Sequence, residues 1–130
     1  MTAPESVTGY VLDGSALAAL LTSHTTALVW LRLARTSGAQ IIVPDSAVAE
    51  ATMVYPHQAD LLARLLDHPA ILTVPAHPEA VAELLDSAGV FDPAAAVVLI
   101  AAEGRGFPVI TGDAGRLRRI VPDGPEIREL

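Results

Sequence analysis

The sequence predicts an α/β protein, a three-layer α/β/α sandwich built on a parallel sheet of four or five strands. Short apolar runs typical of buried strands alternate along the chain with segments whose apolar residues recur at helical spacing. This alternation is the pattern of a parallel sheet with helices on both faces. The chain shows no internal repeat, low-complexity tract or domain boundary, so we expect one domain over residues 1–130, with residues 1–8 as a loose leader.

Turn and capping residues place the individual elements. The strands are expected at residues 10–12, 40–43, 70–74, 108–111 and, at the edge of the sheet, 126–130. The helical segments are expected at residues 16–21, around Leu28 and Leu31, from residue 44 onwards, and at 61–66, 78–87, 92–102 and 116–120. Asp92-Pro93 is a typical helix start, since Asp is favoured as the cap and Pro at the first helical position.

The composition excludes several classes of chemistry. The chain has no cysteine, and all eight of its basic residues are arginine, so cysteine nucleophiles, zinc–thiolate sites and catalytic lysines are absent. A net charge of −7 disfavours tight non-specific binding of nucleic acid, although cations bound to the carboxylates would still allow cleavage. The first residues do not resemble a signal peptide and no apolar run is long enough to span a bilayer, so we expect a cytoplasmic protein with no membrane partner.

Four acidic residues from distant parts of the sequence are expected at one edge of the sheet. Asp13 and Asp113 each follow a strand, and the carboxyl ends of parallel strands emerge at the edge where such folds bind ligands. Glu50 and Asp92 lie near the starts of helices, which gather at the same edge. Four carboxylates repel one another unless a cation compensates them, and carboxylate oxygens select Mg²⁺ or Mn²⁺. One or two such ions can activate water and stabilise a phosphodiester displacement.

Four segments, taken in order, resemble those of a PIN domain, the nuclease fold of VapC-type toxins. They are Val11-Leu12-Asp13 with Ser15-Ala16-Leu17, the stretch 43–50 (VPDSAVAE), the helix from Asp92, and the stretch 108–113 (PVITGD). The similarity extends over nearly the whole chain. It implies an α/β/α sandwich and a Mg²⁺- or Mn²⁺-dependent endoribonuclease, in many members a toxin held inactive by a cognate antitoxin.

The resemblance also implies a role for each matching residue. Asp13 would be the central metal ligand and Glu50 the second acid. Asp113 would complete the site, or bind a second metal ion or a water molecule. The hydroxyl groups of Ser15 and Thr111 would orient the carboxylates or the solvent.

Asp92 departs from the pattern of the family. The third acid of the family lies nearer the following Thr-x-Asp, at a position that corresponds to Ala95 or Ala96 here. A displacement of three residues on a helix turns the side chain by about 60° and moves it by about 4.5 Å. Asp92 is therefore either a ligand that reaches in from the helix start or an ordinary cap, and Asp13, taken alone, has the same two interpretations. The chain is then either an active nuclease on an RNA substrate or a degenerate PIN domain kept as a binding or regulatory module.

Two further features concern partners. Between Gly104 and Val121 the basic residues Arg105, Arg116, Arg118 and Arg119 stand against one acid, Asp113, and this local excess favours a phosphate backbone. Arg116, three residues after Asp113, is the best candidate for a contact with substrate or with a carboxylate. Apolar residues around Leu28, Trp30 and Leu31 predict a homodimer.

Overall fold

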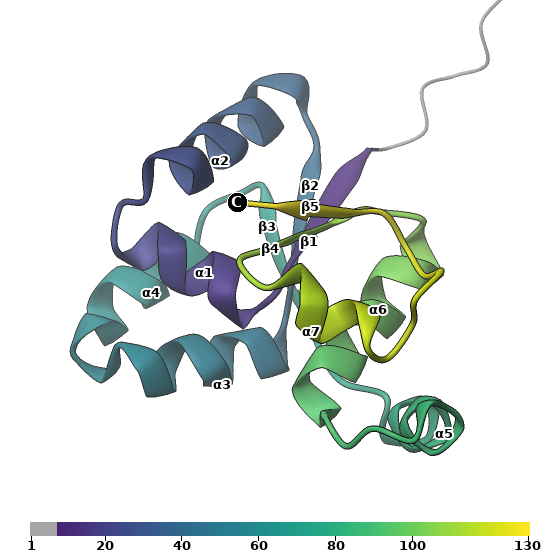
Figure 1. Cartoon of the computed structure of the whole chain (residues 1–130). Coiled ribbons are helices and arrows are strands. Elements are labelled where there is room, and N and C mark those ends of the chain that lie inside the picture. Colours follow the sequence, from purple (N-terminus) through teal and green to yellow (C-terminus); the bar gives the residue numbers. More distant parts are fainter. Residues whose placement is uncertain (1–7) are drawn as a thin grey trace, which may run out of the picture.

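The computed structural model describes residues 8–130, and its strands form one parallel sheet in the order β3-β2-β1-β4-β5 (Figure 1). The strands are β1 Gly9–Leu12, β2 Gln40–Pro44, β3 Ile71–Val74, β4 Val109–Thr111 and β5 Ile127–Glu129. The predicted fold class is confirmed, with five strands rather than four. Of the expected leader only Thr8 is among the described residues; its carbonyl accepts a hydrogen bond from the Gln40 N–H.

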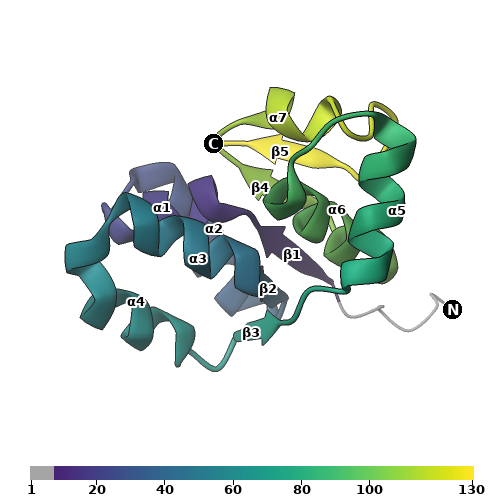
Figure 2. The same ribbon diagram turned by 90° about the horizontal axis from the view of Figure 1, so that it is seen from below.

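The helices form a layer on each side of the sheet (Figures 1 and 2). One layer contains α1 Gly14–Leu21, α2 Thr25–Ser37, α3 Asp45–Val54 and α4 Ala59–Leu66, with a 3₁₀ turn at Pro56–Gln58. The other contains α5 Pro78–Ala88, α6 Pro93–Arg105 and α7 Ala114–Arg118. The break between α1 and α2 falls within the polar run at residues 22–26.

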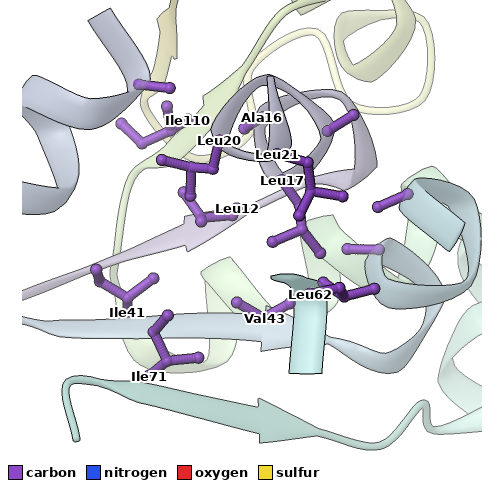
Figure 3. Packing of buried hydrophobic residues seen from close by; sticks show 14 of the residues in the cluster. Leu12, Ala16, Leu17, Leu20, Leu21, Ile41, Val43, Leu62, Ile71 and Ile110 are labelled. Atoms are coloured by element: carbon purple, nitrogen blue, oxygen red, sulfur yellow. The ribbon is translucent and has the colours of Figure 1, made fainter. Parts of the chain in front are cut away.

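Alternate residues of the central strands supply the two halves of the core, because successive side chains of a strand point to opposite faces. Leu12, Val43 and Ile110 pack with Leu17 of α1 on one face (Figure 3). On the other face Val11, Ile42 and Val109 pack with the buried side of α6. Both faces of the strands are therefore buried, which explains why these segments read as continuous apolar runs rather than as alternating ones.

Three of the predicted site acids begin helices. Asp13, Asp92 and Asp113 are the N-cap residues of α1, α6 and α7. Each carboxylate accepts a hydrogen bond from the backbone N–H three residues later, at 2.9, 3.3 and 3.2 Å respectively. Asp13 and Asp92 are therefore caps, as one of their two interpretations holds, and Asp113 is a cap that the sequence analysis did not predict.

Most element boundaries differ from the sequence-based expectation by one or two residues, and two differences in the helices have a clear physical cause. The last helix covers Ala114–Arg118 rather than residues 116–120, because the carboxylate of Asp113 caps it and the helix begins at the next residue. Helix α6 continues to Arg105 rather than ending at 102. Its terminator is Gly106, which adopts φ 68° and takes the left-handed conformation that glycine tolerates best.

Trp30 is half-buried and packs against Tyr10, with 5.3 Å between the ring centroids. The guanidinium of Arg128 lies over both rings, 5.3 Å from the Trp30 centroid and 5.6 Å from that of Tyr10. The large apolar side chains that α2 does expose are Leu28, Val29 and Leu33. Of the residues expected on this surface, Leu28 is exposed, whereas Trp30 and Leu31 are half-buried.

Over residues 8–130 no single helix has both the length and the apolar character needed to cross a membrane. Two consecutive helix pairs, α1 with α2 and α5 with α6, reach that length only together, and they are bent by 101° and 107°.

Candidate functional site

Asp13 lies at the carboxyl end of β1 and is almost completely buried, with 2% of its surface exposed. Its Oδ1 accepts hydrogen bonds from the Ser15 hydroxyl at 2.6 Å and from the Ala16 N–H at 2.9 Å. Its Oδ2 accepts a hydrogen bond from the hydroxyl of Thr111, which ends the neighbouring strand β4. Both oxygens of the carboxylate are therefore held in place.

The chain segment after β4 determines the direction of these hydroxyl protons. The Gly112 N–H donates to Ser15 Oγ at 2.8 Å, and the Asp113 N–H donates to Thr111 Oγ1 at 2.9 Å. Each hydroxyl oxygen thus accepts from a backbone N–H, and its single proton is directed to Asp13. Since both protons are used in this way, the 3.3 Å contact between Ser15 Oγ and Thr111 Oγ1 carries no proton of its own.

Two opposing effects act on the pKa of Asp13. Burial raises it above the ordinary value of 3.8, and this is the larger effect. The hydrogen bonds from Ser15, Thr111 and the Ala16 N–H favour the charged form and lower the pKa, as does the nearby charge of Arg116. A cation near Asp13 therefore stabilises a carboxylate that burial alone disfavours.

The guanidinium of Arg116 joins the other two acids, Glu50 and Asp92. Its Nε donates to Asp92 Oδ2 at 2.7 Å and its Nη2 to Asp92 Oδ1 at 2.8 Å. Towards Glu50, Nη2 donates to Oε2 at 2.7 Å and Nη1 to Oε1 at 3.2 Å. Both carboxylates are thus held by the fork-like geometry that arginine provides.

Within this arginine cluster, Glu50–Arg116–Asp92, the pKa values of Asp92 and Arg116 are shifted. The hydrogen bonds from Arg116 lower the pKa of Asp92 below its ordinary value, more strongly than burial raises it. The two carboxylates raise the pKa of Arg116 further above its already high value. Asp92 and Arg116 therefore both stay charged near neutral pH.

Gly14 brings the arginine cluster next to Asp13. A Cβ atom at position 14 would lie 2.5 Å from Glu50 Oε1 and 2.6 Å from Glu50 Cβ, so the side chain of Glu50 occupies the space that any larger residue would need. Since Gly14 directly follows Asp13, the Glu50 carboxylate lies against the same turn of chain that positions the buried one.

Asp113 belongs to neither set of side-chain contacts. Its backbone N–H supports Thr111, whereas its exposed carboxylate accepts from the Arg116 N–H at 3.2 Å. Among residues 8–130 no three acidic or histidine side chains are grouped closely enough to hold a metal ion as they stand. The cation found between two of the predicted acids is the guanidinium of Arg116.

The donor set nevertheless suits a hard divalent ion. Asp13, Glu50 and Asp92 offer carboxylate oxygens without any sulfur or imidazole, which is the ligand type that Mg²⁺ and Mn²⁺ prefer. The carboxylates of Glu50 and Asp92 face each other across the single nitrogen Nη2 of Arg116. The roles of Asp13, Glu50, Asp92 and Asp113 as metal ligands, and that of Arg116 towards substrate, stay predictions.

Two solved structures share this architecture over almost their whole length. One is a crystal structure of VapBC2 from Rickettsia felis bound to a DNA fragment from its promoter. It is 13% identical to this chain with a TM-score of 0.72, and the match covers 93% of this chain and 98% of that one. The fold is that of the PIN domain. PAE2754 from Pyrobaculum aerophilum is 16% identical with a TM-score of 0.65, and the match covers 97% of this chain and 92% of that one. No protein-family model matches the sequence, and no curated protein is significantly similar to it.

Within this PIN fold, two features of the site escaped the sequence analysis. The first is Gly14, whose missing side chain makes room for Glu50. Its only signal in the sequence is a glycine directly after the strand-terminal Asp13. The second is that one arginine holds both Glu50 and Asp92, from positions 66 and 24 residues away.

Proposed function

We propose that the protein is a Mg²⁺- or Mn²⁺-dependent endoribonuclease of the PIN type. One observation carries the proposal: a buried carboxylate, Asp13, is held by two hydroxyl donors at the carboxyl edge of the sheet, with Glu50 packed beside it on Gly14. Elaborate support for a buried charge is typical of a functional site rather than of a simple helix cap.

The chain would divide the work among its residues. Asp13, Glu50 and Asp92 would hold the ion, which supplies an activated water molecule and charge stabilisation at the phosphate. Ser15 and Thr111 fix the Asp13 oxygens, so that little rearrangement is needed when the ion binds. Arg105, Arg118 and Arg119 lie on or next to α6 and α7 and add positive charge that attracts the RNA backbone towards an otherwise acidic protein.

The biological setting that fits this fold is a bacterial toxin–antitoxin pair in the cytoplasm, with this chain as the toxin. VapBC2, which shares the fold, was crystallised as a complex bound to DNA from its promoter. A cognate antitoxin would be encoded by a small gene directly upstream. Absence of such a gene would contradict the toxin role and leave the nuclease role intact.

The test is RNA cleavage by the purified protein with and without divalent ions. We expect cleavage in Mg²⁺ or Mn²⁺, none in EDTA, and none by Asp13→Asn, which keeps a capping side chain but loses the charge. Asp60→Asn, at an exposed position of α4, is the matched control and should cleave like the parent. Cleavage that persists in EDTA or in Asp13→Asn would contradict the assignment.

A degenerate PIN domain that binds without cleaving is the second candidate. The arginine cluster favours it, because Arg116 already neutralises one of the two charges of Glu50 and Asp92. Titration with Mn²⁺ separates the two candidates. A rise in thermal stability that Asp13→Asn abolishes supports the nuclease, whereas a protein indifferent to Mn²⁺ in every variant supports the binding module.

A further inference from the structure

We propose that Arg116 is an intramolecular competitor for the divalent ion, so that ion binding requires the guanidinium to leave Glu50 and Asp92. This inference rests on the proposed metal dependence and adds a form of regulation that resides in the chain itself. The site then has two states, one closed by arginine and one open to the ion.

The distances make the two occupants mutually exclusive. Nη2 of Arg116 donates to Glu50 Oε2 at 2.7 Å and to Asp92 Oδ1 at 2.8 Å, so one nitrogen contacts both carboxylates. Glu50 and Asp92 would hold the ion through these same carboxylate oxygens, which here accept hydrogen bonds from the guanidinium. The two cations therefore cannot occupy the pair together.

The guanidinium of Arg116 can leave the two carboxylates without disturbing the core. The side chains of Arg116, Glu50 and Asp92 are 21%, 29% and 21% exposed, so solvent reaches the ion pairs, in contrast to buried Asp13. Asp92 also accepts a hydrogen bond from the Ala95 N–H, a contact in which Arg116 takes no part. Glu50 stays confined by its contact with Gly14. Departure of the guanidinium thus leaves Glu50 held against the turn that follows Asp13 and Asp92 held at the start of α6.

Competition multiplies the intrinsic affinity for the ion by the fraction of molecules in which the site is open, so a small open fraction gives a low apparent affinity. Four charge-assisted hydrogen bonds hold the closed state, so this fraction is small. Removing the guanidinium should therefore tighten ion binding, although it deletes no ligand of the ion.

The experiment measures Mn²⁺ affinity by calorimetry for the full chain and three variants. Arg116→Gln should bind Mn²⁺ about tenfold or more tightly than the parent, since its open fraction is close to one. Arg116→Lys, a point charge that cannot bridge four oxygens, should lie between the two. Arg64→Gln is the matched control: it removes one positive charge from an exposed position on α4 and should change the affinity by less than about twofold.

A second measurement observes the exchange in the parent protein. In ¹⁵N–¹H spectra the Nε–H of Arg116, identified by its absence in Arg116→Lys, should shift towards the position of a free guanidinium as Mg²⁺ is added. This readout does not require Arg116→Gln to fold.

The outcomes separate this inference from the proposed function. Equal or weaker binding by Arg116→Gln than by the parent, or an Nε–H signal that ignores Mg²⁺ while the ion binds, overturns the competition and leaves a metal-dependent nuclease possible. Failure of all four proteins to bind Mn²⁺ overturns both. Binding by Arg116→Gln alone supports the competition in its strongest form, in which arginine silences the site.

Discussion

Asp92 serves at once as a helix cap and as an ion-pair partner, and the two contacts involve different donors. The Ala95 N–H donates to its Oδ1, and Arg116 donates to both of its oxygens. An asparagine at this position keeps an acceptor for the cap but loses the charge that binds the guanidinium. The two contributions of this residue to stability can therefore be measured separately.

Asp92→Asn should lower the free energy of unfolding by about 1–3 kcal/mol near neutral pH, because a hydrogen-bonded charge pair is lost. Arg116 lowers the pKa of Asp92 in the folded state, so the unfolded state takes up a proton first as the pH falls. The stabilisation by Asp92 is thus complete above the unfolded value of about 3.8 and is lost as the pH falls through the lowered folded-state value.

Urea unfolding of the parent and of Asp92→Asn, repeated from about pH 7 downwards, checks this prediction. The difference between the two proteins should be constant at neutral pH and should shrink below about pH 5. The raised pKa of Asp13 makes its contribution to stability change with pH in the opposite direction. Asp13 is present in both proteins, so this contribution cancels in the difference. A difference that does not vary with pH would show that Asp92 acts only as a cap.

At the scale of secondary structure, helices α1 and α3 approach each other at Gly14, and the site depends on that approach. Gly14→Ala places a methyl group 2.6 Å from Glu50 Cβ, an atom fixed to the backbone of α3 that cannot rotate away. We expect a loss of about 1–3 kcal/mol in the free energy of unfolding, as for other overpacked sites. Displacement of Glu50 should also weaken Mn²⁺ binding.

Gly104→Ala is the matched control, because it makes the same chemical change in a helix with open space around it. No heavy atom lies within 4 Å of a Cβ at position 104, so alanine should stabilise α6 by up to about 1 kcal/mol. Urea unfolding of the two variants should therefore give effects of opposite sign. If Gly14→Ala proved as harmless as Gly104→Ala, α1 and α3 would not be in the close contact described here.

The helices, the strands and the residues that end the strands could be predicted from the sequence, because they depend on local patterns of residues. Asp13 ends a buried apolar run, and Asp92-Pro93 is a local helix start, so both were placed correctly. The arginine cluster could not be predicted in the same way. Asp92 and Glu50 lie 24 and 66 residues before Arg116, and the three meet only through the packing of α3, α6 and α7. The sequence marked Arg116 as a partner for substrate or carboxylate, and only side-chain geometry shows the carboxylate contacts.

At the scale of the whole molecule, charge and apolar surface are unevenly distributed. The chain carries a net charge of −7, yet α2 contains Arg32 and Arg35 and no acidic residue. The same helix exposes Leu28, Val29 and Leu33, at 43%, 49% and 54% of their surfaces. Val29 and Leu33 are four residues apart and share one face of the helix. This face, and not Trp30, is the surface through which we expect the predicted homodimer to form.

Sedimentation of the parent protein should therefore show a dimer, and the double variant Val29→Glu/Leu33→Glu should sediment as a monomer. The two new carboxylates of each copy would have to be buried opposite those of the other copy. Burying these like charges costs far more free energy than the apolar contact contributed in the parent. Met53→Glu, at a position that is 82% exposed on α3, introduces the same charge elsewhere and should leave the dimer intact. Higher salt should strengthen association of the parent, because it screens the repulsion between two copies of charge −7. A parent protein that remains monomeric at high salt would show that the apolar face of α2 does not bind a second copy of the chain.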